Sequence, residues 1–332
     1  MAIENRELLK KKNFKTVAVI ISHINSARTI GKCLAHLLEQ DYPRQLYQII
    51  VVDAGSADGS VEIVKKMESE MVRQIIAKGA SEPEGQSLGI QLSESNIIMF
   101  TNSDIYVPKN WIRKHVEWLD KGYDLVGGKV FWGGDKYSFT WNMPTPKSPQ
   151  FVQQQGLGLG FSNCSFKRDL LSTCGGLSKL RSQHDTEFAF RVLKCGKKMV
   201  LDPEIEVFHD HPLTRSKMSF TRSFRYAINH VLVMREAYGR IVSGSGCPAM
   251  IPVGGLIREW TLVGGLKTYR ELYPKAYQMN IRVGLIEFLL IRLLSTKLGQ
   301  AVGVFAGAIK PNSALFAIAN THVKVQNFDK PE

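Results

Sequence analysis

The stretch that decides the fold reads Ile49-Ile50-Val51-Val52-Asp53-Ala54-Gly55-Ser56-Ala57-Asp58-Gly59-Ser60. Its first four residues are apolar and β-branched, which is typical of a strand buried on both faces of a parallel sheet. Asp53 ends that run, and a turn of glycine and small polar residues then leads to a helical pattern over Ser60–Glu70. A strand that ends in a polar turn before a helix predicts one unit of an α/β fold.

Two other apolar runs end in the same way. Val17–Ile21 is followed by a polar cluster at 22–26, and Asn96–Phe100 is followed by Thr101–Asp104. The pattern over Thr16–Pro212 therefore predicts an α/β sandwich with a largely parallel sheet. In open α/β sheets, ligands bind beyond the carboxyl ends of the strands, so we expect the three polar clusters to face one crevice.

The remaining segments differ in composition. The chain has 332 residues, of which 44% are hydrophobic and 22% charged, as in folded proteins. Residues 1–15 form a polar tail without the apolar stretch of a secretory signal, so we expect a cytoplasmic protein. The net charge is +13, and residues 213–332 carry 16 Lys and Arg against 6 Asp and Glu. We expect this region to be helical and to make peripheral contact with an anionic membrane, or to mediate a homodimer.

Two carboxylates stand where a transfer reaction would need them. Asp104 follows a predicted strand and is suited to hold a divalent cation that neutralises a leaving diphosphate. Asp185 lies in a polar stretch before a helical pattern over Phe188–Leu193, and it is suited to remove the proton of an attacking hydroxyl. Taken singly, each acid is better explained as a helix cap or a surface charge than as a catalytic group, and it is their order and context that favour catalysis.

In this order, the motifs resemble those of the family-2 glycosyltransferases with the GT-A fold. The resemblance rests on Val19–Asn25, on Ile49–Ser60, which is similar to the family's VVDDGSTDGS segment, on Met99–Asp104 at the place of its metal-binding D-x-D, and on His184–Arg191 at its ED…R block. It runs from about Thr16 to His211. It implies a Rossmann-like α/β/α sandwich of the GT-A type over 16–212, followed by a helical extension over 213–332.

The resemblance also implies roles for single residues. The nucleotide of a nucleotide-diphosphate sugar would be bound by Asp53 together with Ser22, His23, Asn25, Gln86 and Ser103. Asp104 and His209 would hold Mn²⁺ or Mg²⁺, with His211 as the alternative ligand, and Asp185 would be the general base of a single inverting displacement. The supporting or acceptor-side residues would be Asn102, His184, Arg191 and His211.

Four positions depart from the family pattern. Ala54 replaces the second acid of the nucleotide motif, and Asn102 replaces the first acid of the metal motif. Gln86 stands where an arginine is frequent, and His184 stands where a glutamate precedes the base. A neutral amide is a weaker ligand than a carboxylate for a hard cation, so the metal affinity is in question. Asp104 and Asp185 are both retained, which favours an active enzyme.

Several alternatives stay open. A hydroxyl acceptor needs a base whereas a phosphate does not, so Asp185 favours a glycan or lipid-linked glycan acceptor over polyprenyl phosphate. A polyprenyl-phosphate sugar transferase and a catalytically decayed GT-A-like binding protein remain alternatives. A nucleotidyltransferase would need a basic glycine-rich loop after the first strand, where Ser22–Ser26 offers none. The basic residues belong to no recognised nucleic-acid-binding motif, so we expect no nucleic-acid partner.

Overall fold

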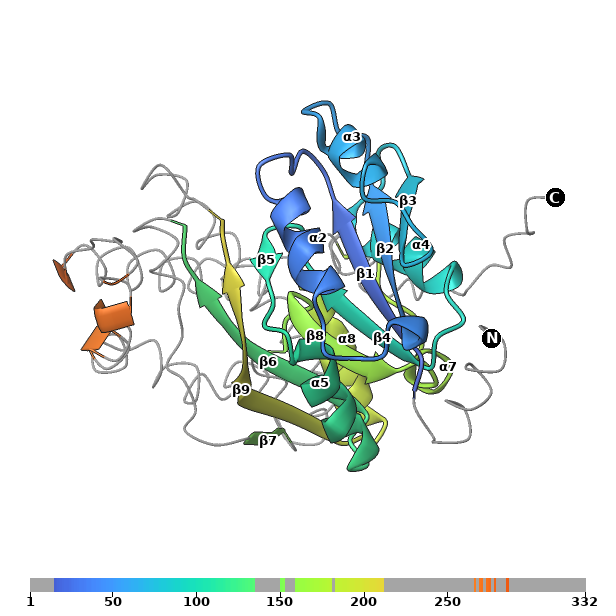
Figure 1. The fold of residues 1–332 in the computed structure, drawn as a ribbon. Helices are drawn as coiled ribbons and strands as arrows, with labels where there is room; N and C mark the ends of the chain where they lie inside the picture. Colours follow the sequence, from blue (N-terminus) through green and yellow to red (C-terminus); the bar gives the residue numbers. More distant parts are fainter. Residues whose placement is uncertain are drawn as a thin grey trace, which may run out of the picture. The chain divides into compact units, whose positions relative to one another are not determined.

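The fold is described from a computed structural model, which covers residues 15–134, 150–152, 159–180, 183–211 and a few helical residues between 266 and 286. Within these residues, nine strands form one sheet, and helices accompany it (Figure 1). The strands are β1 Val17–His23, β2 Tyr47–Asp53, β3 Val72–Ile76, β4 Ile97–Thr101, β5 Ile105–Tyr106, β6 Leu125–Trp132, β7 Gln150–Val152, β8 Asn163–Lys167 and β9 Met199–His209. The helices are α2 Ile30–Leu38, η1 Arg44–Leu46, α3 Ser60–Lys65, α4 Glu82–Gln91, α5 Trp111–Asp120, α7 Leu170–Thr173 and α8 His184–Lys194.

The parallel part of the sheet is built from the runs that the sequence singled out. The order is β3-β2-β1-β4, and all three neighbouring pairs are parallel. Every residue of Val17–Ile21 and Ile49–Val52 has an exposed fraction of 0%. Strands buried on both faces favour β-branched residues, which explains why these segments could be predicted. The expected α/β class with its mostly parallel GT-A-type central sheet is confirmed.

An antiparallel part extends the sheet beyond β4. Strand β8 is antiparallel to both β4 and β6, and the complete order is β3-β2-β1-β4-β8-β6-β9-β5, with β7 beside β9. Residues of β8 alternate between the two faces of the sheet. Cys164 and Phe166 enter the apolar core that includes Phe188 of α8, whereas Asn163 and Ser165 bond to His115 of α5 on the other face.

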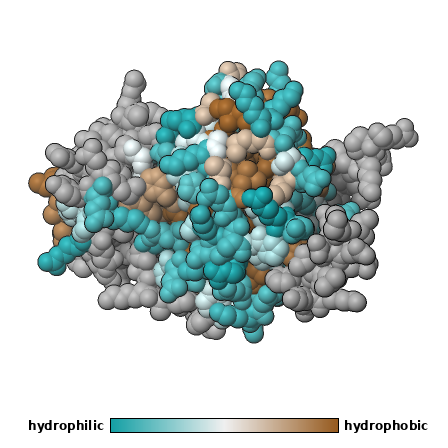
Figure 2. All heavy atoms as spheres, viewed as in Figure 1, coloured by the Kyte–Doolittle hydropathy of each residue, from teal (hydrophilic) through white to brown (hydrophobic). Residues whose placement is uncertain are grey.

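Helices cover both faces of the sheet. Helix α4 lies on β1 and β2, where Gly85 and Gly89 allow a close approach to Ser22 and Ile20. Helix α8 packs on the same face through Phe188, whose ring contacts Phe166. Hydrophilic residues predominate on the described surface in the view of Figure 2, as expected when the apolar faces of the elements are turned inward.

Two helices differ from expectation. The pattern over Ser60–Glu70 predicts a longer helix than the observed α3, because the chain turns after Lys65 to bring Val72 into β3. Helix α4 was not predicted, although its start is signalled in the sequence. Ser81 and Glu84 form a reciprocal capping box there, in which the Ser81 N–H donates to the Glu84 carboxylate over 2.8 Å.

By compactness the chain divides into a unit of residues 1–128, 149–207 and 321–332 and a unit of residues 129–148 and 208–320. In the second unit, the Phe131 and Phe208 rings stack, and the N–H of Gly133 donates to the carbonyl of His209 over 2.9 Å. Most of the expected 213–332 region lies outside the described residues. Among the residues that are described, no helix combines the length and the apolar character needed to cross a membrane.

Candidate active site

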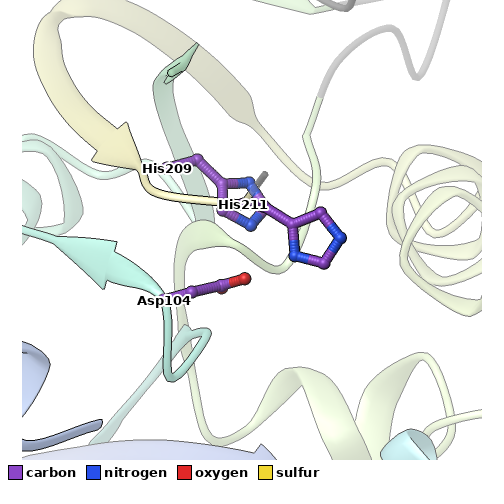
Figure 3. A group of neighbouring side chains, drawn as sticks. All are labelled: Asp104, His209 and His211. Carbon is purple, nitrogen blue, oxygen red and sulfur yellow. The ribbon is translucent and has the colours of Figure 1, made fainter. Parts of the chain in front are cut away.

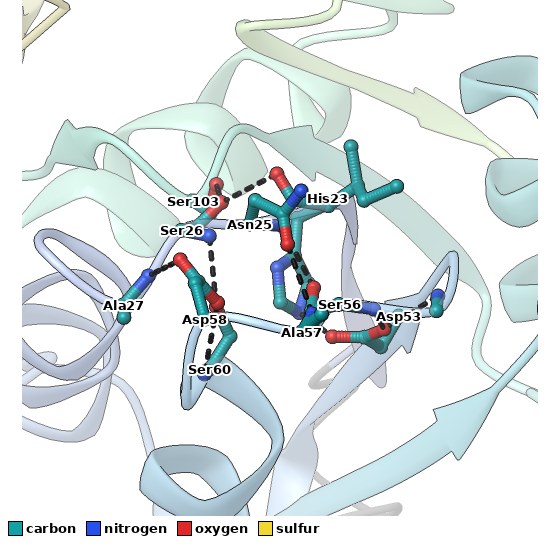
Figure 4. A network of polar contacts seen from close by, with 12 residues as sticks. His23, Asn25, Ser26, Ala27, Asp53, Ser56, Ala57, Asp58, Ser60 and Ser103 are labelled. Carbon is teal, nitrogen blue, oxygen red and sulfur yellow. Dashed lines mark hydrogen bonds and ion pairs between the residues drawn. The ribbon is translucent and has the colours of Figure 1, made fainter.

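Three loops at the carboxyl ends of β1, β2 and β4 are joined by hydrogen bonds (Figure 4). The backbone N–H of Asn25 donates to Ser56 Oγ over 2.7 Å, and the N–H of Ala57 donates to Asn25 Oδ1 over 3.0 Å. The hydroxyls of Ser26 and Ser103 lie 2.7 Å apart, which ties the β1 loop to the end of β4. Asn25 adopts a left-handed backbone conformation with φ 51°, for which asparagine is one of the better-suited residues. The three polar clusters predicted from the sequence therefore share one edge of the sheet.

Asp53 is fully buried within this network. Its Oδ1 accepts two backbone N–H groups, from Gly55 over 2.7 Å and from Ser56 over 2.6 Å. Its Oδ2 lies 3.3 Å from Nε2 of His23, which is also buried. Burial lowers the pKa of His23, against the opposing effects of Asp53 and Asp58. Asp53 thus holds the loop 54–57 in place, with His23 beside it.

Gln86, predicted as a nucleotide contact, is turned toward α8. Its Oε1 lies 3.1 Å from Nε2 of His184, and both residues are buried. Ser22, the neighbouring candidate on β1, lies under α4, where a Cβ on Gly85 would overlap its hydroxyl. These two candidates therefore contribute to the packing between α4, β1 and α8.

Asp185 occupies the first turn of α8, one residue after His184. Its Oδ1 accepts the N–H of Thr186 over 2.7 Å, and its Oδ2 would lie 3.5 Å from a Cβ placed on Gly160. Two residues further on, Ser162 accepts a hydrogen bond from Asn102 Nδ2 over 3.2 Å. The segment 160–162 thus lies beside both Asp185 and the loop that carries Asp104, where β4 ends and β8 begins.

Arg191 stabilises the segment that precedes α8. Its guanidinium donates to the carboxylate of Glu187 and to the carbonyl oxygens of Cys174, Gly175 and Gly176, over 2.5–3.0 Å. Charge-assisted bonds of this kind are among the stronger hydrogen bonds in proteins. Arg191 is one of the predicted supporting residues, and these contacts hold the beginning of the loop that leads to α8.

One group of side chains could hold a metal ion (Figure 3). Asp104, His209 and His211 each bring one ligand atom to within 4.8 Å of the others. His209 is the last residue of β9 and is buried, whereas Asp104 and His211 are partly exposed. One carboxylate oxygen and two imidazole nitrogens are a donor set that suits divalent first-row transition metals.

Two exposed apolar residues at the same strand ends were not singled out from the sequence. Ile24 and Ile76 have exposed fractions of 55% and 53%. In the strand register, Asp53 is paired with His23 on one side and with Ile76 on the other, and Ile24 follows His23. The sequence signal for an exposed apolar residue of this kind is its place at the carboxyl end of a buried strand, next to a polar cluster.

With this geometry established, the comparison with known families is informative. Residues 18–173 match the model of glycosyl transferase family 2. Over these residues the chain is similar to that family. The match begins in β1 and ends in α7, so it includes the loops after β1, β2 and β4. The expected resemblance to family 2 is confirmed over these residues, which include three of the four motifs.

Curated proteins that are similar to this chain are glycosyltransferases. Glycosyltransferase AglE of Haloferax volcanii is 33% identical over 120 residues, which cover 34% of this chain and 39% of AglE. The undecaprenyl-phosphate 4-deoxy-4-formamido-L-arabinose transferase of Aeromonas hydrophila is 25% identical over 120 residues, or 35% of this chain and 37% of that protein. The match therefore spans less than two-fifths of either relative.

Among solved structures, the mannosyltransferase PcManGT of Pyrobaculum calidifontis, in complex with GDP-Man and Mn²⁺, has the same fold. Its TM-score is 0.58 at 19% identity, with 89% of this chain and 86% of that chain covered. At this level of identity the likeness concerns the fold alone.

Proposed function

We propose that this protein is an inverting glycosyltransferase that moves a sugar from a nucleotide-diphosphate sugar to an acceptor hydroxyl. The observation that carries the proposal is the group of Asp104, His209 and His211, whose ligand atoms lie within 4.8 Å of one another and could hold the divalent cation that such a transfer uses. The match of residues 18–173 to family 2 supports the reaction class.

The donor would lie at the joined loops of β1, β2 and β4. We place the nucleobase against the exposed side chains of Ile24 and Ile76, because their apolar surfaces flank the loop that Asp53 holds. Asn25 and Ser103 belong to these loops, and His23, at the end of β1, is buried. That a solved structure of the same fold contains GDP-Man supports a nucleotide-sugar donor.

The metal would be Mn²⁺ or Mg²⁺, held by Asp104, His209 and His211. A divalent cation at this place supplies positive charge that stabilises the leaving diphosphate. The donor set fits such an ion, and the two imidazole nitrogens favour Mn²⁺ over Mg²⁺, which prefers oxygen ligands. The Mn²⁺ in the solved mannosyltransferase structure supports this assignment.

Asp185 would act as the general base. Asp185 is partly exposed at the start of α8, and its Oδ2 lies next to Gly160. Two residues after Gly160, Ser162 is hydrogen-bonded to Asn102 of the loop that carries Asp104. As Asp185 takes the proton, the acceptor oxygen would bond to the anomeric carbon while the bond from that carbon to the nucleoside diphosphate breaks, and this single displacement inverts the anomeric carbon. General-base catalysis of this kind contributes about 10²–10⁴-fold to a rate.

For the acceptor, we propose a lipid-linked or cell-surface glycan at the cytoplasmic membrane face. The excess of basic residues in 213–332 supports contact with an anionic surface. A second candidate, transfer to polyprenyl phosphate, is favoured by the similarity to the undecaprenyl-phosphate sugar transferase of Aeromonas. Offering a purified lipid-linked saccharide and undecaprenyl phosphate side by side distinguishes the two, since only the first presents a sugar hydroxyl.

The test is a screen of nucleotide sugars by thermal shift with and without Mn²⁺, followed by product analysis. A ligand that binds the folded state raises the melting temperature, so one nucleotide sugar should do so only when the metal is present. Asp104→Ala should abolish that metal-dependent shift. Stabilisation by a nucleotide sugar without transfer would leave the decayed binding protein, and the absence of both would refute the proposed enzyme.

A further inference from the structure

A buried hydrogen bond connects helices α4 and α8 through two residues that lie 98 positions apart in the chain. Oε1 of Gln86, in the middle of α4, is 3.1 Å from Nε2 of His184, the first residue of α8. The amide nitrogen of Gln86 faces the carboxylate of Glu82 at 3.4 Å, and a carboxylate can only accept there. The amide oxygen therefore faces His184, which makes Nε2 of His184 the donor.

His184 is enclosed on its other sides. The ring of Phe161 meets the His184 ring edge-on at 5.4 Å between centroids, and His184 has an exposed fraction of 5%. Gln183, just before it, adopts a left-handed conformation with φ 65°. The start of α8 is thus fixed from inside by His184, while the next residue, Asp185, is partly exposed beside Gly160.

Helix α4 is in turn fixed to β1. A Cβ on Gly85 would overlap the hydroxyl of Ser22, and a Cβ on Gly89 would overlap the side chain of Ile20. So close an approach leaves α4 little freedom to shift along the strand. The bond from Gln86 to His184 therefore joins the strand that leads into the nucleotide loops to the helix that carries the candidate base.

We propose that Gln86 and His184 are positioning residues that hold Asp185 at a fixed place relative to the end of β1. The proposal rests on the proposed function, in which Asp185 is the base. It also changes the predicted role of Gln86, which acts through His184 instead of contacting the nucleotide. Displacing a catalytic group by about 1 Å can cost roughly 10²-fold in rate, so one such bond is sufficient to matter.

The test compares Gln86→Met, which keeps the volume and removes the acceptor, with Ser87→Ala. Ser87 is the next residue of α4 and loses a comparable bond, from its hydroxyl to the carbonyl of Pro83 at 2.7 Å. We expect Gln86→Met to lower kcat by about 10–100-fold while the donor Kd, measured by calorimetry, stays within about twofold. Ser87→Ala should leave both values unchanged.

A second comparison separates positioning from general loss of structure. In the Asp185→Asn background, Gln86→Met should not lower the single-turnover rate further, because the group it positions is already gone. His184→Gln, whose amide can still donate to Gln86, should retain more activity than His184→Phe. If Gln86→Met does not fold, the two His184 variants still test the proposal.

The outcomes are distinguishable. A donor Kd weakened as much as kcat in Gln86→Met would make Gln86 a nucleotide contact and overturn the proposal. Normal turnover in Gln86→Met beside an inactive Asp185→Asn would overturn the positioning role alone. Full turnover in Asp185→Asn would overturn the assignment of the base, and the positioning role with it.

Discussion

Nε2 of His23 lies 3.3 Å from Oδ2 of Asp53, and both side chains are buried at the carboxyl ends of neighbouring parallel strands. The other oxygen of Asp53 accepts the N–H groups of Gly55 and Ser56. The carboxylate at the centre of the family's nucleotide motif is therefore part of the framework of the site in this protein. It holds the loop on which the nucleotide would rest.

This arrangement predicts different effects for two substitutions of Asp53. Asp53→Ala removes the acceptor of two backbone N–H groups and should cost about 1–3 kcal/mol in the free energy of unfolding. Asp53→Asn retains an oxygen for the loop and should cost less. Urea unfolding measures both variants. Equal losses of stability would contradict the role of Oδ1 in holding the loop.

A second prediction concerns stability in mild acid. His115 is fully buried between α5 and β8, and burial lowers its pKa to about 4, against the opposing effects of Asn163 and Asp202. The unfolded chain binds this proton near the ordinary pKa of about 6.5, and the folded chain does not, so stability falls as the pH drops from about 6.5 toward 4. The loss approaches about 1.4 kcal/mol per pH unit. The lowered pKa of His23 acts in the same direction.

The measurement is urea unfolding at pH 7.5 and pH 5.5. His115→Gln keeps a polar side chain for Ser165 and Asn163, which lie 2.8 Å and 3.1 Å from the His115 ring nitrogens. The variant should be less stable than the wild type at pH 7.5 and should lose less stability between the two pH values. An unchanged pH dependence would show that His115 does not titrate as its burial requires.

A third prediction tests the close contact between α4 and β1. Gly89→Ala would place a methyl group into the side chain of Ile20, which is buried and stiff, and should destabilise the protein by about 1–3 kcal/mol. Gly31→Ala, in α2, is the matched control. Its Cβ would lie 3.3 Å from Ile63, and the gain in helix propensity of about 1 kcal/mol offsets that tight contact. Similar stability of the two variants would refute the tight packing of α4.

Much of the framework could be predicted from the sequence, because buried parallel strands carry a distinct signal. The runs at Val17–Ile21 and Ile49–Val52 are strands in the structure, and both extend slightly beyond the predicted ends. Pattern alone placed the end of α3 five residues too late. Helix α4 has a weakly amphipathic sequence, so it was overlooked despite its capping box.

The candidate site residues were chosen by residue type and by order in the chain, and neither indicates the contacts that these residues make. The bond between Gln86 and His184 depends on how two helices pack on the sheet, which local patterns do not encode. Burial of Asp53 follows from strand pairing on both sides. The exposure of Ile24 and Ile76 was likewise not foreseen, since apolar residues at strand ends are assigned to the core by default.

A fourth prediction concerns the metal. Titration calorimetry with Mn²⁺ should detect binding to the wild type, and Asp104→Ala and His211→Ala should each weaken it at least about tenfold, because each removes one ligand of the proposed ion. Asn102→Asp adds a carboxylate beside the site and should strengthen Mg²⁺ binding relative to Mn²⁺. The control is Asp120→Asn, an exposed acid at the end of α5. Equal weakening by the control would indicate nonspecific binding.

The most direct test of the account is single-turnover transfer by Asp185→Asn, measured with donor binding on the same preparation. The substitution keeps the size of the side chain and removes its basicity, so the variant should bind the nucleotide sugar and Mn²⁺ as the wild type does. Its transfer rate should fall by about 10²–10⁴-fold. Transfer at the wild-type rate would contradict the assignment of Asp185 as the base.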